Sequence, residues 1–354
     1  MKPKLTRRTG IRHELLAVLS IAFLYAVGCF AQETGGWQAS EILRQSSYKG
    51  TPDFKRLFFV NEALGWATDL GGGLAKTEDG GRSWKLTPYA EGYAAVDSIH
   101  FLHSSRGWVA TNQETSQPGS ASSVLLESSD GGQQWRLWSS LEALKVRALL
   151  DMRFSTNGSA VAVGFIMPGL RSVVLHSGDL GKTWNIVATP RSLLYRLAVG
   201  PRGVLWASGD GGTVLRSEDE GQTWSQVHTR IDMPDGFRGI DAPGEGMAVA
   251  VSDFGGVIIR TVDGGRNWDR ITPPAPYEDL SLSAVRFSNS ESGWAVGEKG
   301  VILSTNDGGK SWKFEAQMGA GYLRDIAIVG NRLVAAGDDG SIFWRDRPSN
   351  RQQN

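Results

Sequence analysis

The chain is short of cysteine. Its 354 residues include a single one, Cys29, which lies in an apolar stretch near the N-terminus. An internal disulfide is therefore excluded. Net charge is lacking too: residues 32–354 carry 32 basic and 36 acidic side chains, a net charge of −4. This balance does not indicate nucleic-acid binding, because proteins that bind nucleic acids usually present a strongly basic surface.

Motifs of the common enzyme classes are also scarce. The sequence contains no Gly-x-Ser-x-Gly, no His-Glu-x-x-His and no phosphate-binding loop. Among the five histidines only His100 and His103 have a spacing that would suit a metal, and we expect this pair to serve packing and surface instead. The sequence therefore predicts no catalytic residue, no metal site and no cofactor.

A repeated box organises the chain. It reads Ser/Thr-x-Asp-x-Gly-x-x-Trp and begins at Thr77, Ser128, Ser177, Ser217, Thr261 and Thr305. Its aspartates, 40 to 51 residues apart, are Asp79, Asp130, Asp179, Asp219, Asp263 and Asp307. We interpret the box as a hairpin turn whose carboxylate accepts backbone amides, whose glycine takes a positive φ and whose Trp anchors the next strand. The alternative is a calcium or sugar site at each aspartate, which six copies in one chain disfavour.

Repetition at this period predicts a propeller built from units of four short strands. A seventh unit begins near Tyr322 but has no box and no fourth strand. Residues 36–43 resemble the strands that follow the boxes, so we predict that they insert beside residues 341–344 and close the ring. The fold prediction is an all-β, seven-bladed β-propeller with ring closure by the N-terminal strand. It forms one domain over residues 35–347, before a polar tail at 348–354.

Residues 1–31 resemble an export signal. Five basic residues precede an apolar run over residues 15–30, which is short for a membrane span. Cleavage before Gln32 and lipidation of Cys29 within Ala26-Val27-Gly28-Cys29 remain open, with an uncleaved anchor as a third outcome. We expect an exported protein of the periplasm, cell surface or thylakoid lumen, which would touch the membrane only through such a lipid.

Basic residues recur at the start of the predicted inner strands. They are Arg56, Arg196, Arg238 and Arg324, with Arg147 joining from the loop before Leu149. Because the first strand of each blade lines the axis of a propeller, these side chains are predicted to gather at one mouth of the channel. Clustered arginine favours bidentate capture of carboxylates. The alternative is that each arginine pairs locally, for example with Asp53, Asp241 or Asp325.

Two long loops are predicted on the same face. Residues 112–123 are polar, whereas residues 165–171 are apolar where the corresponding loops are short and rich in glycine. An exposed apolar loop often marks a contact surface. The alternative is that Phe165 and Ile166 fold back onto the third blade.

The boxes, the arginines of the inner strands and the stretch Gly293-Trp294-Ala295-Val296-Gly297-Glu298-Lys299-Gly300 together resemble one family. It is the photosystem II stability/assembly factor family of seven-bladed propellers, within the wider group of Asp-box (BNR) repeat proteins. The resemblance covers essentially all of the chain after residue 31. It implies an exported, non-enzymatic, monomeric assembly scaffold that binds a protein or peptide, such as a membrane-protein precursor, through an Arg-rich patch. Carried over, the patch consists of Arg56, Arg196, Arg238 and Arg324.

Two other functions remain open. A sialidase-like glycoside hydrolase needs three arginines for the substrate carboxylate, a Tyr-Glu nucleophile pair and an aspartic acid. Its candidates here are Tyr195, Tyr322, Glu245 and Asp53. A cell-surface receptor or matrix propeller is the other alternative, and it would share the binding role without the assembly role.

Overall fold

The computed structural model describes residues 36–43, 50–88, 93, 96–114, 121–231, 236–319 and 321–347. The described residues from Trp37 onward belong to one compact unit. The predicted export signal, Cys29 and the polar tail fall outside the described residues. Within the part of the chain that is described, no helix has the length and apolar character needed to cross a membrane.

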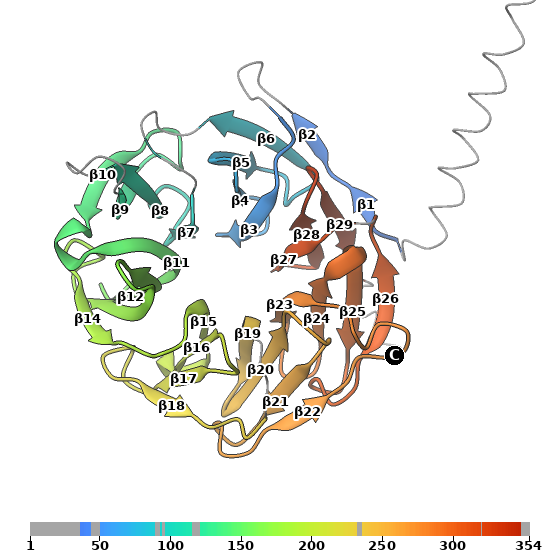
Figure 1. Ribbon diagram of the computed structural model, residues 1–354. Helices are drawn as coiled ribbons and strands as arrows, with labels where there is room; N and C mark the ends of the chain where they lie inside the picture. The colour runs from blue at the N-terminus through green and yellow to red at the C-terminus, as the bar shows by residue number, and fades with distance from the viewer. Residues whose placement is uncertain are drawn as a thin grey trace, which may run out of the picture. The chain divides into compact units, whose positions relative to one another are not determined.

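The described residues form seven sheets of mainly antiparallel strands arranged in a ring, as Figure 1 shows, which confirms the predicted seven-bladed β-propeller. Blade 1 contains β3 (Phe54–Phe59), β4 (Gly65–Asp69), β5 (Gly73–Thr77) and β6 (Ser83–Pro88). Blade 2 contains β7 (Ser98–Phe101), β8 (Gly107–Glu114), β9 (Ala121–Ser128) and β10 (Arg136–Ser140). Blade 3 contains β11 (Val146–Phe154), β12 (Ala160–Ile166), β13 (Arg171–Ser177) and β14 (Asn185–Ala188).

The second half of the ring repeats the same order. Blade 4 contains β15 (Leu194–Val199), β16 (Leu205–Gly209), β17 (Val214–Ser217) and β18 (Ser225–Val227). Blade 5 contains β19 (Phe237–Gly244), β20 (Met247–Ser252), β21 (Ile258–Thr261) and β22 (Asp269–Ile271). Blade 6 contains β23 (Leu282–Phe287), β24 (Gly293–Gly297), β25 (Val301–Thr305) and β26 (Lys313–Gln317). Blade 7 contains β27 (Leu323–Val329), β28 (Arg332–Gly337), β29 (Ile342–Asp346) and, from the N-terminal segment, β1 (Gln38–Ala39). Short 3₁₀ turns lie at Glu142–Leu144, Pro201–Gly203 and Glu298–Gly300.

The N-terminal segment joins the last blade to the first. β1 pairs antiparallel with β29, with Gln38 opposite Trp344, while β2 (Glu41–Leu43) pairs parallel with β6, with Glu41 opposite Ser83. Ser40 lies between them and donates its amide to Ile342 and its hydroxyl to the carbonyl of Gly81. The prediction of one strand over residues 36–43 beside residues 341–344 therefore holds only for its first part. Residues 41–43 instead extend blade 1, so the segment contacts both sides of the closure.

The box forms the turn that its sequence predicts. Asp307 Oδ1 accepts the amide of Ser311 at 3.0 Å and the hydroxyl of Thr305 at 2.8 Å, while Gly309 takes a φ of +80°. The pattern repeats in the other five boxes, at Asp79, Asp130, Asp179, Asp219 and Asp263. The Trp rings vary more than predicted. Those of Trp84, Trp184 and Trp312 are buried, whereas those of Trp135, Trp224 and Trp268 are half-buried.

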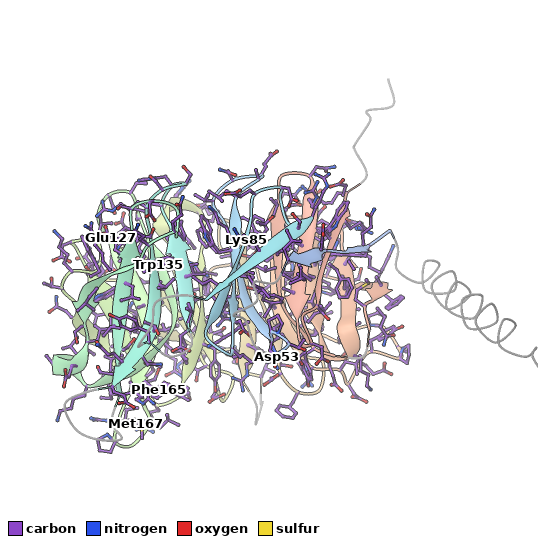
Figure 2. The ribbon with its side chains drawn as sticks, turned by 90° about the horizontal axis from the view of Figure 1, so that it is seen from above. Asp53, Lys85, Glu127, Trp135, Phe165 and Met167 are labelled. Carbon is purple, nitrogen blue, oxygen red and sulfur yellow. The ribbon has the colours of Figure 1, made fainter. Side chains whose placement is uncertain are left out.

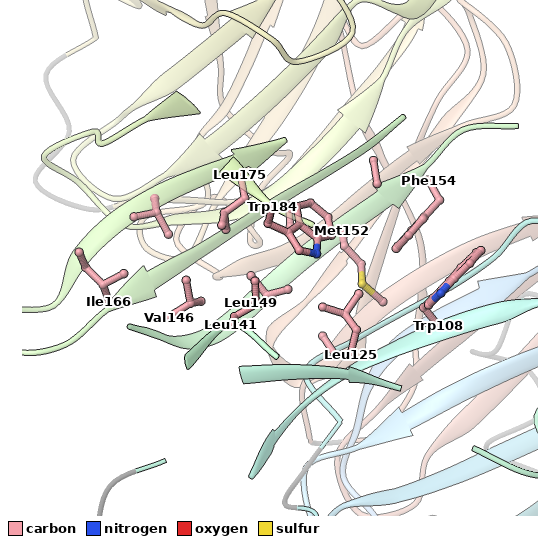
Figure 3. Close-up of a cluster of buried hydrophobic side chains, with 14 residues drawn as sticks. Trp108, Leu125, Leu141, Val146, Leu149, Met152, Phe154, Ile166, Leu175 and Trp184 are labelled. Carbon is pink, nitrogen blue, oxygen red and sulfur yellow. The ribbon is translucent and has the colours of Figure 1, made fainter. Parts of the chain in front are cut away.

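Aromatic rings also pack against each other between neighbouring blades. The ring of Trp108 on β8 stacks on Phe154 of β11, with 4.3 Å between centroids and 4° between planes. Trp66 on β4 stacks in the same way on Phe101 of β7. Figure 3 shows the cluster between blades 2 and 3, where Trp108 and Phe154 adjoin Met152 and other buried side chains. Because each ring buries a large apolar area, these contacts hold the blades together in a protein with no internal disulfide.

Candidate functional site

The first strands of the blades share a bulge that shapes the mouth of the central channel. In six of them the register with the second strand shifts near the start of the strand, for example between Phe54 and Arg56 or between Leu194 and Arg196; in β11 the corresponding shift, between Leu149 and Asp151, follows an earlier one at Arg147. A bulge adds one unpaired residue and redirects its side chain. The six added residues are Lys55, Leu150, Tyr195, Arg238, Ser283 and Arg324, and all six line one cavity of about 500 Å³. The repeated bulge therefore builds the wall of the mouth.

The structure brings four of the five predicted arginines to this cavity. Arg56, Arg196, Arg238 and Arg324 line it together with Lys55. Arg147 does not line it: the residue lies on β11 rather than in a loop, at an earlier register shift of that strand than the one at Leu150. The predicted clustering at one mouth thus holds for Arg56, Arg196, Arg238 and Arg324, and not for Arg147.

Most of the cations at the mouth already have a carboxylate partner. Lys55 Nζ lies 2.9 Å from Asp97, Arg238 Nε donates to Asp253 at 2.7 Å, and Arg324 Nε donates to Asp338. The partners of Arg238 and Arg324 are thus not the aspartates suggested by the sequence. Each of these two arginines bonds its aspartate through Nε and keeps 38% of its side chain exposed. Their terminal nitrogens are not used in these bonds to the aspartates.

The aspartates named in the sequence alternative have other roles. Asp53 accepts the amide of Asp339, and Asp241 accepts the amide of Phe287 at 2.7 Å. Asp325 does pair with arginines, but they come from other blades: Arg196 of the fourth blade at 3.4 Å and Arg286 of the sixth at 3.9 Å. Arg238 and Arg324 do pair locally, but with Asp253 and Asp338 of their own blades instead of these three residues.

Arg238 also stacks on an aromatic ring. Its guanidinium lies 4.0 Å from the centroid of Tyr195, whose hydroxyl donates to Asp210 at 2.5 Å. Burial and this hydrogen bond to Asp210 raise the pKa of Tyr195 to about 12. The phenol therefore stays protonated at neutral pH, and the ring serves as a flat support for Arg238.

The candidates for a glycoside hydrolase do not form a site. Tyr195 and Tyr322 line the mouth, but Glu245 lies in the turn between β19 and β20, at the far end of β19 from Arg238. There it pairs with Arg202 in an exposed ion pair. Asp53 accepts the Asp339 amide and does not line the cavity. The Tyr-Glu pair required by such chemistry is therefore not assembled.

The histidine pair behaves as the sequence suggests. Burial, followed by the charge of Arg153, lowers the pKa of His100 to about 3, while His103 is exposed. The two residues are not part of any His, Cys, Asp or Glu group able to hold a metal, and the described residues contain no such group.

Exposed apolar side chains lie on the loops of the mouth face. Met167 is 48% exposed and Leu170 is 51% exposed in the loop between β12 and β13, and Phe254 is exposed in the loop between β20 and β21. Figure 2 shows Phe165, Met167 and Asp53 at one face of the ring, with Glu127 and Trp135 toward the other. Ile166 packs into the core of blade 3, so the folded-back alternative holds for Ile166 but not for the tip of the loop.

Two arginines of the channel were missed by the sequence reasoning. Arg153 and Arg286 lie further along the first strands, below the mouth, in a second cavity that also contacts Arg56 and Arg196. The available signal was the period of two along a strand, which places residues 56, 153, 196 and 286 on inward-facing positions once the bulges are counted. The residues at the strand starts alone do not reveal this pattern.

Comparisons with known proteins agree with this fold. The family model for "Photosynthesis system II assembly factor YCF48" matches residues 241–319. The solved structure "YCF48 bound to D1 peptide" has a TM-score of 0.69 and 18% identity, covering 88% of this chain and 95% of that one. YCF48 from Cyanidioschyzon merolae has a TM-score of 0.67 and 16% identity, covering 89% and 100%. No curated protein sequence matches the chain.

A second class of solved structures shares the fold at similar identity. The GH74 xyloglucanase from Xanthomonas campestris has a TM-score of 0.63 and 14% identity, covering 88% of this chain and 53% of that one. Identities this low show the propeller fold and nothing about activity. Together with the family-model match, the likeness to the YCF48 structures confirms the resemblance to the photosystem II assembly factor-like propellers.

Proposed function

Starting from this resemblance, we propose that the protein is an exported, non-enzymatic binding scaffold. It recognises an acidic or C-terminal peptide segment of a protein partner at the mouth of its channel. The observation that carries the proposal is the cavity of about 500 Å³ lined by Lys55, Arg56, Arg196, Arg238 and Arg324. A likeness in fold to a YCF48 structure bound to a D1 peptide supports a peptide as the ligand.

Arg238 and Arg324 are the residues that would bind a carboxylate of the partner. Each is held in place through Nε by its own aspartate, so little conformational freedom is lost when the terminal nitrogens bind a carboxylate. The ring of Tyr195 lies beneath Arg238, 4.0 Å from the guanidinium, and supports it by a cation–π contact. Arg196 has a structural role instead. It is only 3% exposed and its guanidinium pairs with Asp325, so it stabilises the wall of the cavity.

The apolar rim would contribute contact area. Met167, Leu170 and Phe254 expose hydrophobic side chains in two loops of the same face as the charged cavity, an arrangement that suits a segment carrying both an acidic end and apolar residues. A membrane-protein precursor with an exposed tail has this character, and an exported scaffold would meet it at the membrane surface.

Fluorescence anisotropy with labelled peptides tests the proposal. An acidic peptide with a free C-terminal carboxylate should bind the parent protein, and binding should weaken as salt screens the charges. The double variant Arg238→Gln, Arg324→Gln should bind at least about tenfold more weakly, since charge-assisted hydrogen bonds contribute about 1.5–3 kcal/mol each. Arg202→Gln is the matched control, because Arg202 pairs with Glu245 near the other face of the ring.

Equal affinity of the double variant and the control would contradict the proposal. Because the two substituted pairs are half-exposed, the melting temperature should change little, and circular dichroism would check this. The hydrolase alternative has its own test: hydrolysis of a fluorogenic sialoside that is lost on Tyr322→Phe would replace the scaffold by an enzyme.

A further inference from the structure

The channel holds a second cavity below the mouth. It has a volume of about 320 Å³ and is lined by charged side chains from four blades, namely Arg56, Asp151, Arg153, Arg196 and Arg286. It shares Arg56 and Arg196 with the mouth cavity, so the two spaces adjoin. Arg238 and Arg324, the carboxylate-binding residues of the proposed function, do not line it. The cavity is therefore a separate place in which a small ligand could bind.

The arginines of this cavity are oriented mainly by backbone carbonyls. Arg56 Nη2 donates to the carbonyls of Leu150 and Tyr195, each at 3.3 Å. Arg286 Nη1 donates to the carbonyls of Val285 and Ile240. A carbonyl fixes the direction of a guanidinium but carries no net charge, so these bonds by themselves do not neutralise the positive charges.

Arg153 and Arg196 combine both kinds of partner. Arg153 Nη1 donates to Asp151 at 2.6 Å and Nη2 donates to the carbonyl of Leu197 at 2.9 Å. Arg196 meets Asp325 at 3.4 Å. Arg286 has a more distant carboxylate, because its Nη2 lies 3.9 Å from Asp325 Oδ1.

Three aspartates lie near these four arginines, and each also accepts a hydrogen bond from a backbone amide of the next blade. Asp151 accepts the amide of Leu197, Asp325 that of Leu57, and Asp241 that of Phe287. Burial lowers the pKa of Arg56, since the loss of water outweighs the attraction of Asp151 and Asp325. Four arginines against three carboxylates leave one uncompensated positive charge among the described residues of the channel.

An uncompensated buried charge is expensive, and a protein usually supplies it with a counter-ion. We propose that the channel binds one small inorganic oxyanion, of the phosphate or sulfate class, between Arg56 of blade 1, Arg153 of blade 3 and Arg286 of blade 6. Guanidinium groups match the oxygens of such anions in paired hydrogen bonds. The anion enters through the mouth and, once bound, links three blades that no disulfide connects.

Anomalous diffraction locates the anion directly. Crystals of the full-length propeller soaked in selenate, an oxyanion with an anomalous scatterer, should show a difference peak inside the channel within contact of Arg153 and Arg286. A channel without a peak, in crystals where selenate occupies surface positions only, overturns the proposal. This experiment needs no substitution and so does not depend on how a variant folds.

Thermal melting measures the same site in solution. Phosphate should raise the melting temperature more than sodium chloride at equal ionic strength, because a ligand of the native state stabilises it. Arg286→Gln should shift the phosphate concentration of half-effect at least about tenfold upward, as expected for the loss of one charge-assisted contact. Arg202→Gln should leave it unchanged.

Arg286→Lys adds a check against a merely structural effect, because it keeps the charge but loses the paired donors. It should fall between the parent and Arg286→Gln. An identical phosphate response in parent, Arg286→Gln and Arg153→Gln overturns the proposal. Since no peptide is present in these measurements, their outcome is independent of the proposed function.

Discussion

Arg196 of blade 4 and Asp325 of blade 7 form an ion pair across the channel, with 3.4 Å between Nη2 and Oδ1 and both side chains almost fully buried. The residues lie 129 positions apart in the chain. Asp325 also accepts the amide of Leu57 in blade 1 at 3.0 Å. One carboxylate thus joins three blades, and its partner Arg196 lines both the mouth and the deeper cavity.

Removal of this carboxylate should destabilise the ring. We expect Asp325→Ala to lower the free energy of unfolding by about 3–5 kcal/mol, because it leaves Arg196 buried without its counter-charge. The double variant Arg196→Met, Asp325→Leu should recover part of the loss. Urea unfolding of the two single variants and the double variant gives the coupling energy. Purely additive effects would show that the pair contributes little.

The N-terminal segment that closes the ring should contribute as much to the stability of the fold as a blade does. Trp37 is 4% exposed and packs in the core cluster of blades 6 and 7, next to β1. Trp37→Ala should lower the free energy of unfolding by about 3–5 kcal/mol, since it removes a large buried ring and loosens the closure. Leu43→Ala, at an exposed position of β2, is the control and should change it little. Equal urea midpoints for Trp37→Ala and the parent would refute the role of the closure.

The lowered pKa values of the box aspartates predict that the free energy of unfolding decreases in acid. Hydrogen bonds from the side chain and amide of Thr223 lower the pKa of Asp219 from 3.8 to about 2, and those from the amide and side chain of Asn267 do the same for Asp263. The folded pKa lies below the unfolded one, so this stabilisation is complete above about pH 4 and disappears as the pH falls toward 2. Unfolding measured between pH 5 and pH 2 should show a steep decline.

A variant of one box separates this effect from general acid sensitivity. The pKa of Asp307 is also lowered to about 2 by the hydrogen bonds of Ser311 and Thr305, which outweigh desolvation. Asp307→Asn should therefore reduce the steepness of the acid decline, whereas Glu291→Gln, an exposed position in the neighbouring turn, should not. Parallel pH profiles for both variants and the parent would argue against the boxes as the source.

The apolar rim predicts an effect on binding without an effect on stability. The double variant Met167→Ser, Leu170→Ser should weaken the peptide affinity by about fivefold per side chain, since burying the exposed half of such a residue contributes about 1 kcal/mol. Val262→Ser is a matched control, because Val262 is equally exposed but lies in a box turn. Melting temperatures should stay within a degree or two of the parent. An unchanged affinity would limit the partner surface to the cationic mouth.

Much of the fold follows from local patterns in the sequence. Each box contains its own donors and acceptor within seven residues, as in Thr305, Asp307 and Ser311, so its turn needs no distant partner. Six such turns at a regular period specify the blades, and the missing fourth strand of blade 7 points to the N-terminal segment. The split of that segment at Ser40 could not be read in advance, because it depends on blade 1 lying beside blade 7.

The binding site, too, was predicted only in part from the sequence. The sequence by itself placed Arg56, Arg196, Arg238 and Arg324 at one end of the inner strands, because strand order and position decide which end a residue occupies. Only the tertiary structure decided that Arg196 is a buried support, that Arg238 and Arg324 bond their aspartates through Nε, and that Arg153 and Arg286 face a shared cavity. The physical reason is that burial and charge balance in the channel are sums over all seven blades, and closing the ring is what brings residues more than a hundred positions apart into contact.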